Sequence, residues 1–155
     1  MERFEIGNDK IVNGRIIEGS FVEDPEITSL IIPEGITDIG ELAFYGCANL
    51  RELDLTSFKK PDAPRSMKYM FANCTQLKTI YASADWDFQY VFTLDSGSSI
   101  EDKTVEYQHN FTGIFQNCIN LRGGKGTKWE SENQSNEMYL TIDGGAAAPG
   151  YFTKK

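Results

Sequence analysis

Short runs of alternating apolar and polar residues recur along the chain. Residues 50–55 read LRELDL, and residues 77–82 (LKTIYA) and 27–32 (ITSLII) repeat the same arrangement. Because successive side chains of a β-strand point to opposite faces, each run predicts a strand with one apolar face. Leu53 and Leu55 are therefore expected to face a core, while their polar neighbours face outward.

A seven-residue block precedes two of these runs and recurs once more near residue 120. It reads Phe-x-(Gly/Asn)-Cys-x-(Asn/Gln)-Leu at residues 44–50, 71–77 and 115–121, and it holds all three cysteines of the chain. The steps from residue 27 to 50, 77 and 121 are 23, 27 and 44 residues. Such a pattern indicates stacked structural repeats, because one repeat alone cannot bury its apolar face.

These residues resemble the BspA-like, or treponemal-type, class of bacterial leucine-rich repeats. Steps of 23 and 27 residues fall within the range of roughly 20–29 for leucine-rich repeats. Residues 27–50 match the repeat of this class nearly throughout, including Pro33, Gly40, Phe44 and Cys47. The resemblance extends over about residues 20–155. It implies a leucine-rich-repeat solenoid, mostly β with short helical turns, built on a parallel β-sheet.

Three segments are expected within this fold. Residues 1–26 are expected to form an N-terminal β-hairpin cap, since the Asn-Gly pair at 13–14 is a strong turn signal between apolar residues. Residues 27–121 carry the BspA-like repeats, with an insertion near residues 84–103 that lengthens the third step. Residues 122–155 are expected to form a C-terminal β cap, because a stack of repeats needs both ends closed.

Two local patterns add detail to this picture. Met67, Met70 and Phe71 are spaced as on one face of a helix, which predicts a single helical turn. Residues 138–142 (MYLTI) alternate and predict a strand, after which residues 151–152 are expected to fold back.

The charge balance argues against several classes of partner. Lys and Arg number 15 against 23 for Asp and Glu, a formal net charge of −8. An acidic surface repels phosphate backbones and anionic lipids, so neither nucleic acid nor membrane binding is expected. No stretch approaches the ~20 apolar residues that span a bilayer. The first residues lack the pattern of a secretory signal, which leaves a cytoplasmic protein and a mature exported form both open.

The sequence offers no catalytic, cofactor-binding or metal site. His109 is the only histidine and no motif surrounds it. The three cysteines lack the spacing of zinc ligands and are expected to be buried free thiols. The acidic residues between 85 and 102 lack the pattern of a calcium loop, and residues 123–128 (GGKGTK) lack the order of a phosphate-binding loop.

The outward positions of the predicted sheet form the candidate binding surface, because repeat stacks of this kind bind on the concave face of the sheet. Asp54 and Tyr81 are expected to be neighbours across adjacent strands and to lie free of the core, with Glu52 and Thr79 in the next row. Four strands of about five residues, ~4.8 Å apart and rising ~3.3 Å per residue, give a flat sheet area of about 320 Å². This area is well below the ~800 Å² per partner of a standard protein interface. A further segment or second copy must then contribute, or the ligand is small. The candidate residues are Ser29, Ile31, Glu52, Asp54, Thr79 and Tyr81.

An aromatic segment offers an alternative surface. Residues 86–92 alternate in a way that predicts a strand with one aromatic face. That face either packs into the core or forms an exposed platform for sugar rings or apolar side chains. The alternative binding residues are Trp86, Phe88 and Tyr90.

The leading expectation is a non-catalytic recognition module. By resemblance to BspA-like proteins, it would belong to a bacterial cell-surface or secreted protein that acts in adhesion or host interaction. Carboxylates beside an aromatic ring favour a basic peptide or a sugar, so the expected partner is a protein or a glycan. Two alternatives stay open: a glycan-binding module that uses residues 81–92, and a purely structural repeat segment that could self-associate.

Overall fold

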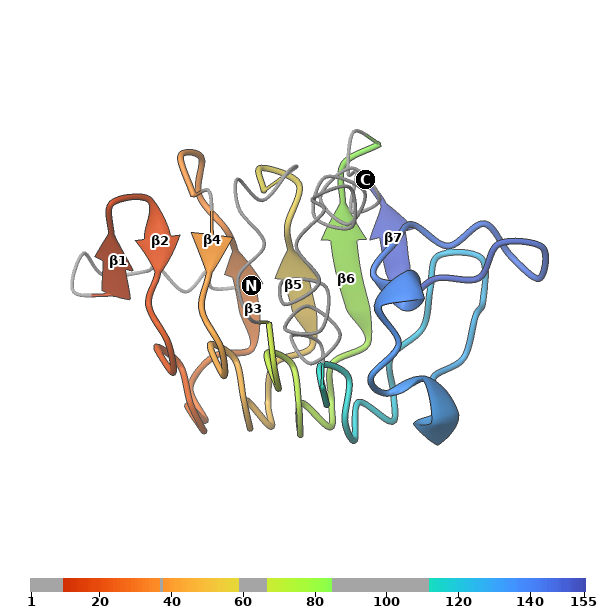
Figure 1. Ribbon diagram of the computed structural model, residues 1–155, viewed down its shortest axis with the longest axis horizontal. Coiled ribbons are helices and arrows are strands. Elements are labelled where there is room, and N and C mark those ends of the chain that lie inside the picture. Colours follow the sequence, from red (N-terminus) through yellow and green to blue (C-terminus); the bar gives the residue numbers. More distant parts are fainter. Residues whose placement is uncertain (1–9, 37, 59–66, 85–111) are drawn as a thin grey trace, which may run out of the picture.

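The computed structural model describes residues 10–36, 38–58, 67–84 and 112–155. Within these ranges the regular elements are short strands and a few residues of 3-10 helix, with no α-helix (Figure 1). The strands lie side by side along the long axis of the molecule, and tight turns line its lower edge in this view. The described part of the chain is therefore mostly β.

Four strands form a parallel sheet in the order β3 (Ser29–Ile31), β5 (Glu52–Asp54), β6 (Thr79–Ala82) and β7 (Phe152–Lys154). The first three are the predicted runs, and β7 comes from the far end of the chain. The register places one apolar residue of each strand, at most 1% exposed, at the same height on the inner face: Leu30, Leu53, Ile80 and Phe152. A one-residue slip would expose this whole row, so burial fixes the register.

The predicted N-terminal hairpin is present. β1 (Ile11–Val12) and β2 (Arg15–Ile16) pair antiparallel. Asn13 and Gly14 between them have φ values of 51° and 76°, the left-handed pair that a two-residue turn requires. The hairpin joins β4 (Asp38–Ile39) in a second, three-stranded sheet in which β2 and β4 run parallel. The alternating pattern of the sequence did not predict β4.

A column of phenylalanine rings runs through the repeats. The rings of Phe21, Phe44, Phe71 and Phe115, hereafter the phenylalanine column, stack with centroid distances of 5.7, 6.0 and 5.9 Å. All four are at most 1% exposed. Phe21 opens an additional block, FVEDPEI at residues 21–27, which the sequence analysis missed because aspartate replaces the cysteine.

Backbone hydrogen bonds join the turns along the phenylalanine column. The first three column residues each donate the backbone amide to a carbonyl of the next repeat: Phe21 to Ala43 at 2.8 Å, Phe44 to Met70 at 3.0 Å, and Phe71 to Ile114 at 3.1 Å. Equivalent bonds run from the residues two before and two after each of these phenylalanines. The turns are thus paired with one another much as the strands are.

The third position of the block carries glycine or asparagine for a conformational reason. Gly46, Asn73 and Asn117 have φ values of 72°, 60° and 57°, in the left-handed region that these residue types tolerate best. Glu23 takes the same conformation in the additional block, with φ of 54°. The left-handed residue turns the chain back toward the sheet in every repeat.

The cysteine and asparagine positions of the block bind the preceding repeat. Each thiol donates to the carbonyl oxygen of a column phenylalanine at 3.0 Å: Cys47 to Phe21, Cys74 to Phe44, and Cys118 to Phe71. The side-chain amides of Asn49 and Asn120 donate to the carbonyl oxygens of Pro25 and Thr75 at 2.9 and 2.7 Å. All three cysteines are buried and free, as predicted.

The helical turn predicted at Met67, Met70 and Phe71 is wrong. Residues 68–73 form turns, and Tyr69 has φ of 54°, which no right-handed helix allows. Tyr69 donates its amide to Thr112 across the long third step, at 3.0 Å. Pairing with the next repeat therefore determines this backbone, although the three apolar side chains are buried as their spacing suggests.

The long third step still stacks in line with the others. The turn at residues 112–121 pairs directly with the turn at residues 69–77, as the Tyr69 and Phe71 amide bonds show. Apart from Ala84, the predicted insertion near residues 84–103 lies outside the described residues.

The predicted strand over residues 138–142 is also wrong. The region contains the 3-10 helices η2 (Ser131–Asn133) and η3 (Glu137–Tyr139), and only Ile142 makes a β-bridge, to Phe152. The side chain of Asn136 accepts the amide of Met138 at 3.0 Å, a local bond that favours a turn. The Tyr151 ring packs edge-on against Phe115, with the ring centroids 5.0 Å apart, and so continues the phenylalanine column. The chain then returns through β7, parallel to β6.

One buried carboxylate organises the loops at the C-terminal end. Asp143 is 3% exposed and accepts amide bonds from Lys125, Thr127 and Gly145 at 2.9 to 3.0 Å. It also accepts the hydroxyl of Thr127 at 2.7 Å and the amide of Gly150 at 3.4 Å. Burial opposes ionisation, but these hydrogen bonds outweigh it and lower the pKa of Asp143 to about 2.

The phenylalanine column should contribute strongly to stability. Phe71→Ala is expected to lower the free energy of unfolding by ~3–5 kcal/mol, since it leaves a cavity between two stacked rings. Val22→Ala, at a position 42% exposed in the additional block, should change it by less than ~0.5 kcal/mol. Urea unfolding measures both, and an unchanged midpoint for Phe71→Ala would contradict the alignment of the repeats.

The thiols of Cys74 and Cys118 should be inert in the folded protein. Burial raises the pKa of Cys118 to about 12, and the Cys47 thiol together with burial raises that of Cys74. We expect an aromatic disulfide reagent to titrate three thiols in denaturant without reductant, and Cys74 to react slowly in the native protein. Fewer than three reactive thiols in denaturant would indicate a disulfide or a bound metal.

Asp143 should make stability depend on pH. Its folded pKa of about 2 lies below the ordinary 3.8, so the stabilisation is complete above that ordinary value and is lost as the pH falls toward 2. Asp143→Asn should lower the free energy of unfolding at neutral pH by about 2–4 kcal/mol and flatten its acid dependence below pH ~4. Glu34→Gln, at an exposed loop position, is the control and should keep the wild-type profile in thermal unfolding at several pH values.

Candidate functional site

The outward face of the four-stranded sheet brings the predicted surface residues together. Its register aligns Ser29, Glu52 and Thr79 in one row. The next row consists of Ile31, Asp54, Tyr81 and Thr153. The predicted adjacency of Asp54 with Tyr81, and of Glu52 with Thr79, is therefore confirmed.

Asp54 differs from the expectation that it lies free on this face. It is 7% exposed, whereas the other candidate residues are half-buried. One carboxylate oxygen accepts the amide and the hydroxyl of Thr56 at 2.9 and 2.6 Å. The other oxygen pairs with the Nζ atom of Lys155 at 2.7 Å.

Lys155 reaches Asp54 because β7 lies next to β6, which the sequence pattern did not reveal. Its ammonium group also lies 4.8 Å from the centroid of the Tyr81 ring, a cation–π contact. Asp54 is thus neutralised by the chain itself, and Tyr81 carries a cation over its ring. Of the predicted carboxylate pair, Glu52 is the member left to receive a ligand.

The protonation states of this cluster follow from its contacts. Burial opposes ionisation of Asp54, but the hydrogen bonds from Lys155 and Thr56 outweigh burial and lower its pKa. The bond to Asp54 raises the pKa of Lys155. Both groups are charged at neutral pH, so the cluster is a fixed ion pair with no group poised for acid–base chemistry.

The alternative aromatic surface is not described by the structure. Trp86, Phe88 and Tyr90 lie outside the described residues, as do His109 and the acidic residues of segment 85–102. In the ranges that are described, no group of three or more His, Cys, Asp or Glu side chains is placed to hold a metal ion.

The glycine-rich loop at residues 123–128 binds a carboxylate of its own chain. The amides of Lys125 and Thr127 point at Asp143, as does the Thr127 hydroxyl. The hydrogen-bond donors that this loop could offer to a phosphate are therefore already occupied by Asp143.

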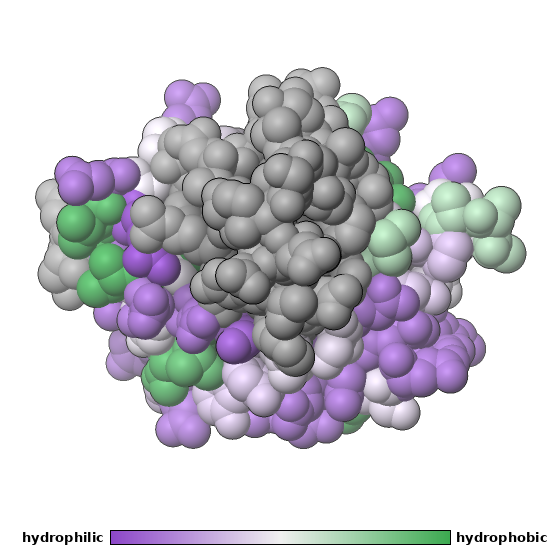
Figure 2. All heavy atoms as spheres, in the orientation of Figure 1, coloured by the Kyte–Doolittle hydropathy of each residue, from purple (hydrophilic) through white to green (hydrophobic). Residues whose placement is uncertain are grey.

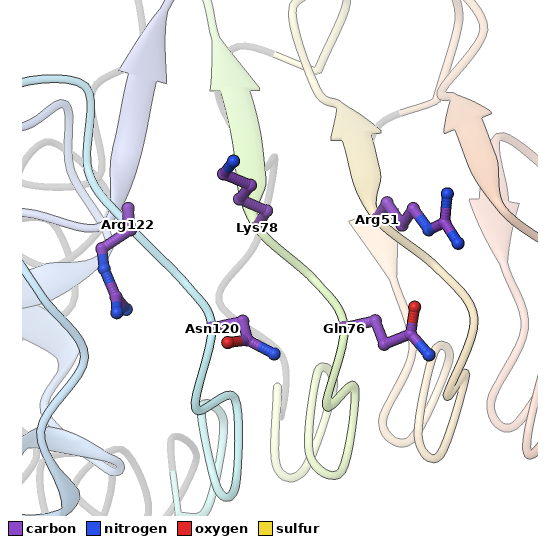
Figure 3. A pocket seen from close by; sticks show the side chains of 5 residues that line it. All are labelled: Arg51, Gln76, Lys78, Asn120 and Arg122. Carbon is purple, nitrogen blue, oxygen red and sulfur yellow. The ribbon is translucent and has the colours of Figure 1, made fainter.

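A second surface feature escaped the sequence analysis. Arg51, Lys78 and Arg122 line a hollow of about 420 Å³ together with Gln76 and Asn120 (Figure 3). A signal was present in the sequence, because each cation directly follows the leucine that ends a block. The described surface visible in Figure 2 is mostly hydrophilic, with small separate hydrophobic patches.

Comparison with known sequence families identifies the repeats. The BspA type leucine rich repeat region matches residues 14–125 in six copies, which is more than half of the chain. The chain belongs to this family. The comparisons with curated proteins and with solved structures found no match.

Membership of the BspA-type family defines a general role. Its leucine-rich repeats are associated with interaction and adhesion, generally at surfaces, and repeat families of this kind are generally non-catalytic. No helix among the described residues is long and apolar enough to cross a membrane.

Proposed function

We propose that this chain is a non-catalytic recognition module of a bacterial cell-surface or secreted protein that acts in adhesion or host interaction. The ligand is a protein or a glycan, held on the outward face of the four-stranded sheet. The family repeats extend over residues 14–125, and we propose that the hairpin of β1 and β2 and the residues after 125 close the two ends of the repeat array.

The contrast between the two faces of the sheet is the main support for this proposal. On the inner face the repeats present the same type of residue at the same height, Leu30, Leu53 and Ile80. On the outer face the corresponding positions differ in chemistry from strand to strand. The backbone is thus held rigid by repetition, while the outer side chains other than Asp54, which Lys155 and Thr56 hold, can differ between strands and so specify a ligand.

The outer face favours a polar ligand with hydroxyl or basic groups. Glu52 and Thr79 are neighbours and supply acceptors, and the Tyr81 ring lies one row away. With strands of three or four residues, the sheet offers about 200 Å², which is small against the ~800 Å² of a standard protein interface. A peptide segment or a short glycan fits it better than a large flat protein surface.

Two other functions are proposed as alternatives to ligand binding on the sheet. A glycan-binding module could use Trp86, Phe88 and Tyr90 in place of the sheet. A purely structural repeat segment would bind no ligand and would self-associate, which sedimentation velocity ultracentrifugation measures directly.

The test uses arrays of glycans and of basic peptides. Wild-type protein should bind at least one member, and Glu52→Ala with Tyr81→Ala should weaken that binding about 10-fold or more while the melting temperature stays near that of wild type. Asp54 is left intact, because its bonds to Lys155 and Thr56 support the fold.

The matched control carries the same changes away from the sheet. Glu41→Ala with Tyr45→Ala, on the turn side, should bind as wild type does. Equal binding by the sheet variant and the control would remove the sheet face as the site and direct attention to Trp86. Self-association without any array binding would favour the structural alternative.

A further inference from the structure

Three consecutive repeats each place a cation at the entry to the sheet. Arg51 and Lys78 directly precede β5 and β6, and Arg122 occupies the equivalent position of the next repeat. The backbone fixes this row, because the Lys78 amide donates to the Arg51 carbonyl at 2.9 Å and the Arg122 amide to the Lys78 carbonyl at 3.0 Å. With paired backbones ~4.8 Å apart, the three attachment points span about 10 Å.

The row borders a hollow of a size suited to a ligand. Its volume of about 420 Å³ lies within the ~300–1,000 Å³ typical of ligand pockets. Figure 3 shows Gln76 and Asn120 below the cations, on the coils that lead into β6 and the following repeat. All five lining side chains are polar or charged.

No carboxylate in the described part of the chain neutralises these cations. Across residues 10–36, 38–58, 67–84 and 112–155, no acidic side chain lies within ion-pair distance of Arg51, Lys78 or Arg122. The Arg122 guanidinium is held by the carbonyl oxygens of Leu121 and Ile119 at 2.9 and 3.4 Å. This local excess of positive charge occurs in a chain with a net charge of −8.

We propose that this hollow, the basic pocket, binds an anionic saccharide, a sugar chain that bears carboxylate or sulfate groups. Arginine presents a planar fork of donors that matches both oxyanions, and lysine adds a point charge. The pocket lies at the strand entries, apart from the outward rows of the sheet. The proposal therefore does not depend on the sheet as a binding site.

The amides of the pocket suit the hydroxyl groups of a sugar. Asn120 donates its amide nitrogen to the Thr75 carbonyl at 2.7 Å, which leaves its side-chain oxygen to accept from a hydroxyl. Gln76 makes no hydrogen bond through its side chain within the described part of the chain. It can donate and accept at once.

An acidic peptide fits this pocket less well. Side chains on one face of an extended peptide are ~6.6 Å apart, two residues at ~3.3 Å, against ~4.8 Å between the cation-bearing backbones. Peptide interfaces also rely on apolar or aromatic anchors, and the five residues that line the pocket provide none.

The first repeat limits the pocket at one end. Thr28 stands where the later repeats carry a cation, and Glu26 stands where they carry Gln76 or Asn120. A carboxylate at that position repels an anion, so the ligand is directed along the three basic repeats.

Isothermal titration calorimetry with three probes of matched charge tests the proposal. The probes are a sulfated hexasaccharide, a uronic acid hexasaccharide and an oligo-glutamate peptide. We expect at least one saccharide to bind, more weakly as salt rises, and the peptide to bind more weakly than that saccharide. Arg51→Gln with Lys78→Gln should reduce saccharide affinity about 10-fold or more.

The matched control removes two exposed charges elsewhere. Lys125→Gln with Lys154→Gln gives the same net charge and should stay within about 2-fold of wild type. No saccharide binding at low salt, equal losses in the pocket variant and the control, or tighter binding of the peptide would each overturn the proposal. The sheet variant Glu52→Ala with Tyr81→Ala should bind the saccharide as wild type does, so failure of this proposal and of the sheet site are distinguishable.

Discussion

The contact between one turn and the next is the constraint on which the rest of this structure depends. Each turn offers its neighbour an aromatic ring, and its backbone amides donate to carbonyls of the following repeat. The cysteine thiol donates in the opposite direction, to the preceding repeat. Because a buried turn needs partners for its backbone groups, this pairing lets non-helical, left-handed backbone lie against the core without unsatisfied donors.

The parts of the fold that could be predicted from the sequence are those with a recurring pattern of buried residues or a distinctive local turn. The leucine rows, the hairpin at Asn13-Gly14 and the buried cysteines could all be inferred, because each leaves a periodic or local signal. The helical turn at Met67 could not be judged from spacing alone. Pairing with a turn more than forty residues away in the sequence overrides the local preference there.

The candidate site, too, could be predicted where it follows the local pattern and not where it depends on contacts between distant segments. Register placed Tyr81 beside Asp54, as the alternation predicted. The alternating pattern gave no indication that β7 pairs with β6 and places Lys155 beside Asp54. A strand that comes from a distant segment leaves no signal in the local sequence. The basic pocket did leave a signal in the sequence, because its three cations occupy equivalent positions after each block. The pattern alone does not show that they line one hollow, since they meet only when successive repeats are stacked.

Native-state hydrogen exchange tests the pairing of the turns most directly. The account predicts that the amides of Leu42, Phe44 and Gly46 exchange as slowly as those of Tyr69, Phe71 and Asn73, all at the free energy of global unfolding. The second set donates to residues 112–116, beyond the long third step. Fast exchange at Tyr69, Phe71 and Asn73 alone, with the earlier amides protected, would show that the stack stops at the third step and would contradict the account.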